Sequence, residues 1–403
     1  RCLVFPGLVN THHHMYQTLQ RNVPHVQNAK LFTWLKKLYQ IWKFVDAEVV
    51  EASTRLACAE LLKTGCTTTT DHFYVFPKGV GPDPIGIQIK AARGLGIRFH
   101  PTRGSMSLSE KDGGLPPDSV VQDEETILTD CEAVVKRYHD PLPGAMVRVA
   151  LAPCSPFSVS DGLLAKSARL ARQLGVRLHT HLCETEDEEH YCLKRSGMRP
   201  LALMQQHEWV GPDVWFAHGI WFNDDELKVL RETGTHIAHC PTSNMRLASG
   251  ICRVREMRDL GINVGLAVDG SASNDSSDML GEMRACLMLQ RVRYGADAIA
   301  APEVLEIATL GGARLLGRDD IGRLAPGYRA DLVVVNLDRM EFAGALSDPL
   351  AAIIFSGFNH NVDEVMVEGR WVVREGRLVH GVEEAIGRKA NELSFRMLKQ
   401  AGY

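Results

Sequence analysis

Apolar, strand-like runs alternate with amphipathic, helix-like stretches along the first two thirds of the chain. Eight apolar runs can be recognised: Leu3–His14, Cys66–Phe73, Ile97–Arg103, Met146–Ala152, Val176–His181, Val214–His218, His236–Cys240 and Val264–Asp269. Helical patterns separate most of them, as in Ala47–Thr64, Glu124–His139, Gly162–Leu174 and Asp224–Thr233. Eight strand–helix alternations predict an α/β fold, a distorted (β/α)8 TIM-like barrel with its helices outside.

The pattern changes after Gly322, where short β runs replace the alternation. These runs, Asp331–Asn336, Val362–Glu368 and Trp371–Val373, precede a helical stretch at Val382–Gln400. We therefore predict a barrel over residues 6–321 and a C-terminal β-sandwich portion with a closing helix over 322–403. Residues 1–5 are expected to be an entry strand or the end of the small β domain.

Two segments are too long for simple connections between a strand and a helix. They are Asn22–Phe44 and the polar stretch Gly104–Gln122, which contains Gly113-Gly114 and Pro116-Pro117 and is expected to be a loop. Long insertions after barrel strands usually cover the active site, and we expect the same here.

Composition limits the partners. The 403 residues are 45% hydrophobic and 23% charged, with a net charge of −4, so nothing favours nucleic acid or an anionic membrane surface. No apolar run approaches the 18 residues of a membrane span. The ten cysteines include no C-x-x-C pair and are interpreted as free thiols of a cytoplasmic protein.

The segment Pro6-Gly7-Leu8-Val9-Asn10-Thr11-His12-His13-His14 runs an apolar strand into three histidines. Side chains alternate on an extended strand, so His12 and His14 share one face and His13 takes the other. Two neutral imidazoles on one face can bind a metal ion. The alternative is an ordinary polar loop, but the apolar residues before the histidines favour a core strand.

Further polar residues follow the other predicted strands. His179 and His181 end strand five and Glu184 follows them; His218 ends strand six and Asp269 ends strand eight. In a barrel these ends form the rim that carries the active site.

Three imidazoles and a carboxylate on that rim predict metal-assisted hydrolysis, with a nearby free carboxylate to move protons. Alternation does not separate His179 from His181, but His181 lies nearer the rim and is the better ligand. His179 is expected to pack beneath it. Glu184 fits the proton-moving acid and base.

These blocks resemble the amidohydrolase superfamily, in the branch of aminohydrolases and chlorohydrolases that act on purines, pterins and triazines. The matching segments include Thr-His-Leu-Cys-Glu-Thr, Ala-His-Gly, Ala-His-Cys-Pro-Thr-Ser-Asn-Met-Arg and Val-Asp-Gly-Ser-Ala-Ser-Asn, in family order. The resemblance implies that His12, His14, His181 and Asp269 bind the metal. It also implies that Glu184 shuttles protons, that His218 steadies the attacking water and the tetrahedral intermediate, and that Asp269 accepts the water proton.

Two departures from the family pattern matter. Binuclear members carry a lysine on strand four that becomes carbamylated, whereas Met146–Ala152 offers only Arg148, which stays protonated. One divalent metal per chain is therefore expected, zinc first and iron as the alternative. Family members also carry a longer stretch before the first histidine motif, so the small β domain is expected to be truncated or incomplete.

Four residues are candidates for substrate contact. The side-chain amide of Gln17 could form hydrogen bonds with a ring lactam. The indole of Trp34 could pack against a flat heterocycle, although packing between helices explains this tryptophan equally well. Arg103 could meet carbonyl oxygens. Cys154 stands where many relatives have histidine in a Pro-His-x-Pro block, which favours a compact free base over a ribosylated one.

The segments His-His-His-Met-Tyr-Gln-Thr-Leu and Arg-Gly-Ser-Met-Ser-Leu-Ser are most similar to 8-oxoguanine deaminases. That similarity implies hydrolysis of the 2-amino group, which gives urate and ammonia. Deamination of isoxanthopterin or guanine, removal of an alkylamino group from a hydroxytriazine, ring-opening amide hydrolysis and a non-catalytic metal scaffold are the alternatives. A small heterocycle is the expected partner, and the family suggests a homo-oligomer, a dimer or larger.

Overall fold

The computed structural model describes residues 1–356 and 361–403, and it confirms the predicted barrel. Eight strands pair in parallel in chain order, from β2 to β9. They are β2 (Leu8–Asn10), β3 (Cys66–Phe73), β4 (Arg98–Ser105), β5 (Ala150–Pro153), β6 (Leu178–Leu182), β7 (Val214–His218), β8 (His236–His239) and β9 (Val264–Leu266).

The two ends of this sheet meet around the first histidine motif. The Thr11 N–H donates to the Leu266 carbonyl at 3.0 Å, and the Asp269 N–H donates to the His12 carbonyl at 3.1 Å. The first and eighth strands of the barrel therefore lie side by side, which brings the chain just after β2 next to the chain just after β9.

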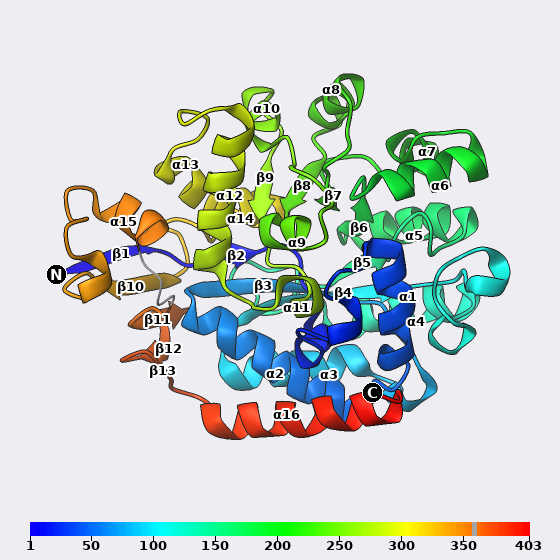
Figure 1. Cartoon of the computed structure of the whole chain (residues 1–403), viewed down its shortest axis with the longest axis horizontal. Coiled ribbons are helices and arrows are strands. Elements are labelled where there is room, and N and C mark those ends of the chain that lie inside the picture. The colour runs from blue at the N-terminus through cyan, green and yellow to red at the C-terminus, as the bar shows by residue number, and fades with distance from the viewer. Residues whose placement is uncertain (357–360) are drawn as a thin grey trace.

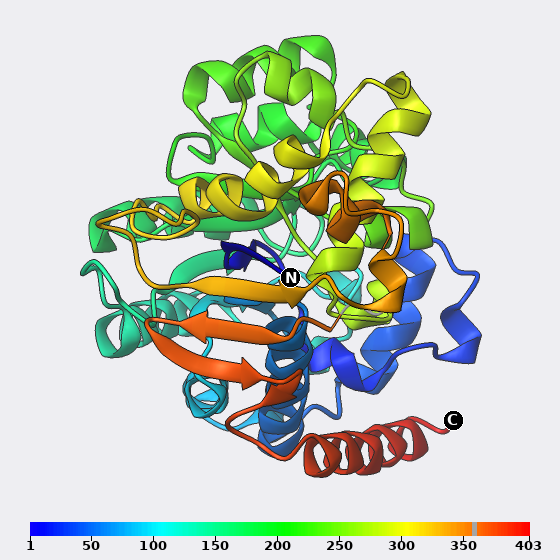
Figure 2. The same cartoon turned by 90° about the vertical axis from the view of Figure 1, so that its left-hand side faces the viewer.

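A second, antiparallel sheet lies beside the barrel (Figures 1 and 2). Its order is β1-β10-β11-β12-β13, with β1 (Cys2–Pro6), β10 (Leu332–Asn336), β11 (Glu364–Val367), β12 (Arg370–Arg374) and β13 (Arg377–Leu378). The predicted C-terminal β runs are confirmed as strands, and β1 joins them by pairing with β10 from Cys2 opposite Asn336 to Pro6 opposite Leu332.

The single strand predicted over Leu3–His14 is in fact two strands in two sheets. The chain leaves β1 and enters β2 at Gly7. A Cβ atom at Gly7 would lie 2.0 Å from the Thr67 Oγ1, so only glycine lets the backbone pass β3 this closely.

Helices surround the barrel, and the four predicted helical stretches are confirmed to within about two residues, the usual scatter of helix ends. They are α1 (Leu31–Trp42), α2 (Ala47–Lys63), α3 (Pro84–Leu95), α4 (Glu124–Tyr138), α5 (Asp161–Leu174), α6 (Glu186–Ser196), α7 (Pro200–Gln206), α8 (Asp224–Thr233), α9 (Pro241–Arg246), α10 (Val254–Asp259), α11 (Ser271–Asn274), α12 (Met279–Tyr294), α13 (Ala301–Glu306), α14 (Gly312–Leu315), α15 (Pro349–Phe355) and α16 (Glu383–Gln400).

The closing helix α16 lies along α2 on the outside of the barrel, at the bottom of Figure 1. Ion pairs fix it there: Arg396 binds Asp46 at 2.6 Å and Lys63 binds Glu383 at 2.6 Å. In the described part of the chain, no helix has the length and apolar character needed to cross a membrane.

The two long insertions after barrel strands differ in secondary structure. Residues 22–44 contain α1, whereas 104–122 continue from the end of β4 into an irregular segment with two short 3-10 turns, Glu110–Asp112 and Asp118–Val120. The second segment is the loop that its glycines and prolines predicted.

Candidate active site

Four side chains from three barrel strands converge at the carboxyl rim. The Nε2 atoms of His12 and His14 lie 3.3 and 3.4 Å from Oδ1 of Asp269, and the Nε2 atoms of His14 and His181 are 3.0 Å apart. All four residues are at least 92% buried. Donor atoms around one tetrahedral zinc ion, with bonds of about 2.0–2.1 Å, are about 3.4 Å from each other. The four residues therefore fit a single metal ion.

A buried nitrogen atom without a hydrogen-bond partner in the described structure lies in the same cluster. The Nε2 of His12 is buried and has no hydrogen-bond partner among the described residues. A buried polar atom without a partner costs free energy that a bound cation would offset. His72 on β3 adds a fourth imidazole, whose nearest nitrogen lies within 4.8 Å of those of His12, His14 and His181.

Backbone carbonyls fix the tautomers of two of these histidines. The Nδ1–H of His14 donates to the His72 carbonyl at 2.8 Å, and the Nδ1–H of His181 donates to the Cys154 carbonyl at 2.6 Å. Each ring therefore presents an unprotonated Nε2 to the cluster, as a metal ligand must.

His12 is oriented through another histidine. The Nδ1–H of His179 donates to the Trp215 carbonyl at 3.0 Å, so the Nε2 of His179 is an acceptor. His12 therefore donates its own Nδ1–H to that Nε2, at 2.7 Å, and keeps its Nε2 free for a metal. The sequence predicted His179 as packing beneath the site, and the structure places it there with this added contact.

Burial keeps the cluster neutral apart from Asp269. Desolvation lowers the pKa of His181 to about 3 and lowers the pKa values of His12 and His14 as well. Burial alone would raise the pKa of Asp269, but its close contact with His12 and the neighbouring imidazoles outweigh burial and hold that pKa well below its usual range. Neutral imidazoles around one carboxylate are the donor set that zinc binds.

Glu184 and His218 stand over this cluster. The Oε2 of Glu184 lies 3.5 Å from the Nε2 of His218, which is 4.0 Å from Oδ2 of Asp269. Burial raises the pKa of Glu184 to about 6. Burial would lower the pKa of His218, but the charges of Glu184 and Asp269 raise it. A carboxyl group and an imidazole whose pKa values are both raised can exchange protons with a bound molecule.

Neighbouring side chains hold Glu184, His218 and Asp269 in place. The Nδ1 of His218 lies 2.9 Å from Oδ1 of Asn244, and Ser243 donates to Oδ2 of Asp269 at 2.6 Å. Glu188, fully buried on α6, accepts the backbone N–H of Cys183 and of Glu184, each at 3.0 Å. None of these three was singled out from the sequence, although Ser243 and Asn244 lie in the quoted Pro-Thr-Ser-Asn block.

The backbone is strained at the same rim. Cys183, His218 and Asp269 have φ values of 54°, 73° and 64°, in the left-handed region that non-glycine residues seldom adopt. Each such residue costs about 1–3 kcal/mol and persists where the surroundings over-determine it, often at functional sites.

A narrow cavity of about 30 Å³ opens above the cluster. It is lined by His14, Gln17, Leu31, Trp34, Leu35, Tyr74, Cys154, Phe157, His181, Glu184, His218, Leu247, Asp269 and Ser273. The first insertion therefore covers the site, as predicted, because α1 supplies three lining residues. A volume of this size holds one or two water molecules, so a bicyclic substrate requires its walls to move apart.

Two of the predicted substrate contacts present unsatisfied polar atoms. The Oε1 of Gln17 and the Nε1 of Trp34 are buried and have no hydrogen-bond partner in the described structure. One is an acceptor and the other a donor, so a ring that carries N–H and C=O groups would satisfy both. Cys154 also lines the cavity, and burial raises the pKa of its thiol to about 12, which keeps it neutral.

The structure does not bring Arg103 to this cavity. Its Nε donates to Asp130 on α4 at 2.7 Å and its Nη2 donates to Gln122 at 2.8 Å, while its guanidinium covers the Phe76 ring at 3.9 Å. These contacts lie outside the barrel. The second insertion, residues 104–122, also contributes no side chain to the cavity lining.

Comparisons with known proteins agree with this geometry. The amidohydrolase family profile matches residues 3–372. The chain is 52% identical over 385 residues to the 8-oxoguanine deaminase of Pseudomonas aeruginosa, covering 96% of this chain and 85% of that protein. It is 39% identical to the hydroxydechloroatrazine ethylaminohydrolase of Pseudomonas sp. strain ADP, covering 98% and 82%.

Among solved structures, the atrazine chlorohydrolase of Arthrobacter aurescens TC1 complexed with zinc superposes with a TM-score of 0.92 at 32% identity. That superposition covers 98% of this chain and 88% of the chlorohydrolase. Sequence, fold and the rim cluster agree, and the chain belongs to the amidohydrolase family.

Proposed function

We propose that this protein hydrolyses the 2-amino group of 8-oxoguanine to give urate and ammonia, with one zinc ion held by His12, His14, His181 and Asp269. The observation that carries the proposal is the position of Glu184 and His218 directly above those four residues. The 52% identity to an 8-oxoguanine deaminase supports the choice of substrate.

The proposed proton transfers follow from the side chains. A zinc ion would act as a Lewis acid and lower the pKa of water towards neutrality. Asp269 accepts the proton that the water loses. His218 has its Nδ1 engaged by Asn244 and presents Nε2 to negative charge that develops at the attacked carbon. Glu184, protonated at the start, gives its proton to the ring nitrogen beside that carbon. It then carries the hydroxyl proton of the adduct to the leaving amine and is protonated again by the proton held on Asp269.

The cavity favours a flat oxo-heterocycle. The free Oε1 of Gln17 can accept a ring N–H, and the free Nε1–H of Trp34 can donate to a ring carbonyl. Leu35 and Phe157 supply apolar walls, and Cys154 adds a small neutral one. 8-Oxoguanine carries N–H and C=O groups on both rings. Isoxanthopterin, guanine and hydroxytriazines share part of this pattern and are the alternatives.

Ammonia release from the zinc-loaded protein tests the proposal. 8-Oxoguanine is expected to give a kcat/KM above about 10⁴ M⁻¹s⁻¹, with guanine, isoxanthopterin and a hydroxytriazine well below it. A Glu184→Gln variant should lose about 10²–10⁴-fold in kcat and retain its zinc. Turnover of another heterocycle alone would keep the reaction class and replace the substrate. Loss of ring absorbance without ammonia would instead indicate ring opening.

Three further proposals concern the whole molecule. We infer a cytoplasmic location, which the ten free cysteines support. A homo-oligomer, dimer or larger, remains a prediction that light scattering on the purified protein would check. The division at residues 6–321 and 322–403 also remains a proposal, which limited proteolysis would test.

A further inference from the structure

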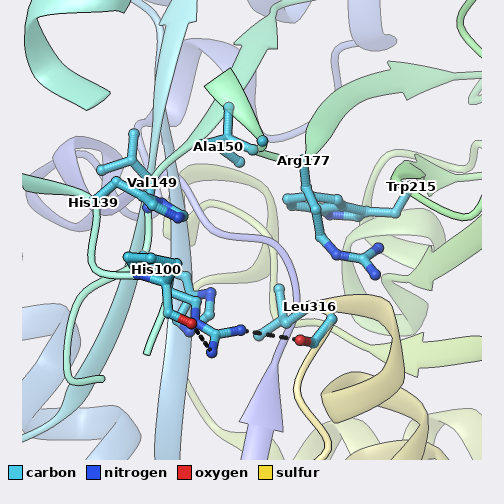
Figure 3. A pocket seen from close by; sticks show the side chains of 12 residues that line it. His100, His139, Val149, Ala150, Arg177, Trp215 and Leu316 are labelled. Atoms are coloured by element: carbon cyan, nitrogen blue, oxygen red, sulfur yellow. Dashed lines mark hydrogen bonds between the residues drawn. The ribbon is translucent and has the colours of Figure 1, made fainter. Parts of the chain in front are cut away.

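A second cavity, of about 240 Å³, lies at the amino-terminal end of the barrel strands, opposite the rim that carries the histidine cluster (Figure 3). His100 from β4, Arg177 just before β6 and Trp215 near the start of β7 line it, together with Arg148. Figure 3 shows the rings of His100 and His139 on one side and Arg177 with Trp215 on the other. None of the residues lining it is acidic.

Neither arginine is paired with a carboxylate of the described residues. Arg148 donates to the carbonyls of Gly317 and Pro141, both at 3.0 Å, and Arg177 donates to those of Pro212 at 2.7 Å and Leu315 at 3.0 Å. Among the ion pairs of residues 1–356 and 361–403, neither arginine appears. The Nε of Arg148 is buried and has no partner among these residues.

Two of the nearby acidic groups pair with other arginines, whereas Asp140 and Asp319 act on Arg148 only through their charge. Asp213 pairs with Arg172 at 3.0 Å, and Asp320 pairs with Arg318 at 2.7 Å. Two partly buried guanidinium groups therefore face one cavity whose described lining holds no carboxylate, so an anion inside it would be the negative charge nearest to both.

The two histidines are set as hydrogen-bond donors. The Arg318 Nη1 donates to the Nε2 of His100 at 3.3 Å, and the Val149 N–H donates to the Nδ1 of His139 at 3.0 Å. Burial lowers the pKa values of both rings, so both are neutral at pH 7. The remaining nitrogen of each ring therefore carries a proton, and no described residue accepts it.

Close approach of the backbone completes the site. Gly317 has a φ of 65°, and a Cβ there would lie 2.3 Å from the Nε of Arg177. Only glycine leaves that edge of the guanidinium uncovered.

We propose that this cavity binds a small free oxyanion, a phosphate or an organic carboxylate, between the guanidinium groups of Arg148 and Arg177. Guanidinium groups bind both kinds of oxyanion through paired N–H donors. The site is independent of the proposed deaminase reaction and lies at the other end of the barrel.

The occupant would adjoin the metal-binding network. Trp215 lines the cavity, and its indole stacks on the ring of His179 with centroids 4.5 Å apart and planes 15° apart. His179 in turn accepts from His12. An anion in the cavity should therefore change the fluorescence of Trp215, and a Trp215→Phe variant should lose that part of the signal.

Calorimetric titration of the zinc-loaded protein with inorganic phosphate and, separately, malonate tests the proposal at an ionic strength fixed with sodium chloride. At least one probe should bind saturably, with a dissociation constant of about 1 mM or tighter. Arg177→Gln and Arg148→Gln should each weaken binding about tenfold or more. The matched control is Arg169→Gln on the outer face of α5, where Arg169 is 63% exposed and pairs with Glu208.

The outcomes separate this site from the metal. Binding that both cavity variants weaken, and that the control leaves unchanged, supports the proposal, and the tighter probe identifies the ligand class. Saturable binding that competes with the heterocyclic substrate and is insensitive to both variants would place the anion at the metal instead and overturn it. Absence of saturable binding of either probe also overturns it. If Arg177→Gln fails to fold, the half-exposed Arg148 still provides the test.

Discussion

Replacing Glu188 with glutamine is expected to slow catalysis without removing the metal. Both carboxylate oxygens of Glu188 accept backbone N–H groups, one from Cys183 and one from Glu184, each at 3.0 Å. Glutamine keeps one acceptor oxygen and turns an NH₂ group towards the other N–H. The peptide that carries Glu184 should then shift, whereas the four metal-binding side chains keep their partners.

The size of the effect follows from these bonds. A buried hydrogen bond to a charged group contributes about 1.5–3 kcal/mol, and each 1.36 kcal/mol of barrier is tenfold in rate. If the loss of this hydrogen bond moves Glu184 away from its place above the metal-binding residues, the barrier rises by that amount. The value of kcat should then fall about ten- to a hundredfold. KM should change little, because Glu188 does not line the cavity.

The same substitution should change how stability depends on pH. Burial raises the pKa of Glu188 from 4.5 to about 7. Between these pH values the folded chain binds the proton more tightly than the unfolded chain, so this group lowers stability as pH rises, by about 3 kcal/mol in total. Glutamine does not titrate, and the Glu188→Gln protein should lack this contribution.

Steady-state kinetics, zinc content and urea unfolding at pH 5 and pH 8 check both expectations. The control is Glu189→Gln, the next residue on α6, whose carboxylate pairs with Arg199 near the surface. A Glu188→Gln enzyme with kcat within twofold of the parent, or a loss equal to that of the control, would refute the positioning role. An unchanged difference in stability between the two pH values would refute the raised pKa.

Three other perturbations have defined outcomes. His179→Leu removes the acceptor of the His12 Nδ1–H and should lower zinc affinity about 10- to 100-fold, measured by competition with a chromogenic chelator; unaltered affinity would contradict the role given to His179. Removal of zinc with a chelator should lower the melting temperature, and added zinc should restore it in a concentration-dependent way. Gly7→Ala should destabilise the fold by about 1–3 kcal/mol, because its Cβ would overlap Thr67, and an unchanged unfolding midpoint would show that the strands can separate there.

Much of the fold could be predicted because barrel strands and their helices differ in period. Strands buried on both faces appear in the sequence as short apolar runs, and the helices that cover them appear as amphipathic stretches. This difference located the strands β3 to β9 along the chain. The division between β1 and β2 could not be predicted, because an extended apolar run does not show which sheet it joins. The crossing depends on the close contact of Gly7 with Thr67, which only the folded chain reveals.

The alternation of side chains along the strands explains where the predicted site residues lie. His12 and His14 share a face, as alternation predicted, and His13 turns away to bond Ser277 at 3.0 Å. Register on β4 places Thr102 opposite His72 and Arg103 opposite Phe73, so Arg103 belongs to the outer face.

The supporting contacts could not be predicted in the same way. Asn244 reaches His218 from a different part of the chain, and Glu188 turns back onto the backbone of the irregular segment just before its own helix; no periodicity in the sequence marks either contact.

The pairing of β1 with β10 has a consequence for synthesis on the ribosome. β1 ends one residue before the barrel begins, yet its partner is Leu332–Asn336, more than three hundred residues later. Until that strand has been made, β1 lacks the pairing with β10 that it has in the folded chain, and such distant contacts form slowly. His12 and His14 would therefore be anchored on both sides only near the end of translation. Metal acquisition should accordingly follow completion of the chain, and nascent chains that stop before β10 should bind zinc weakly.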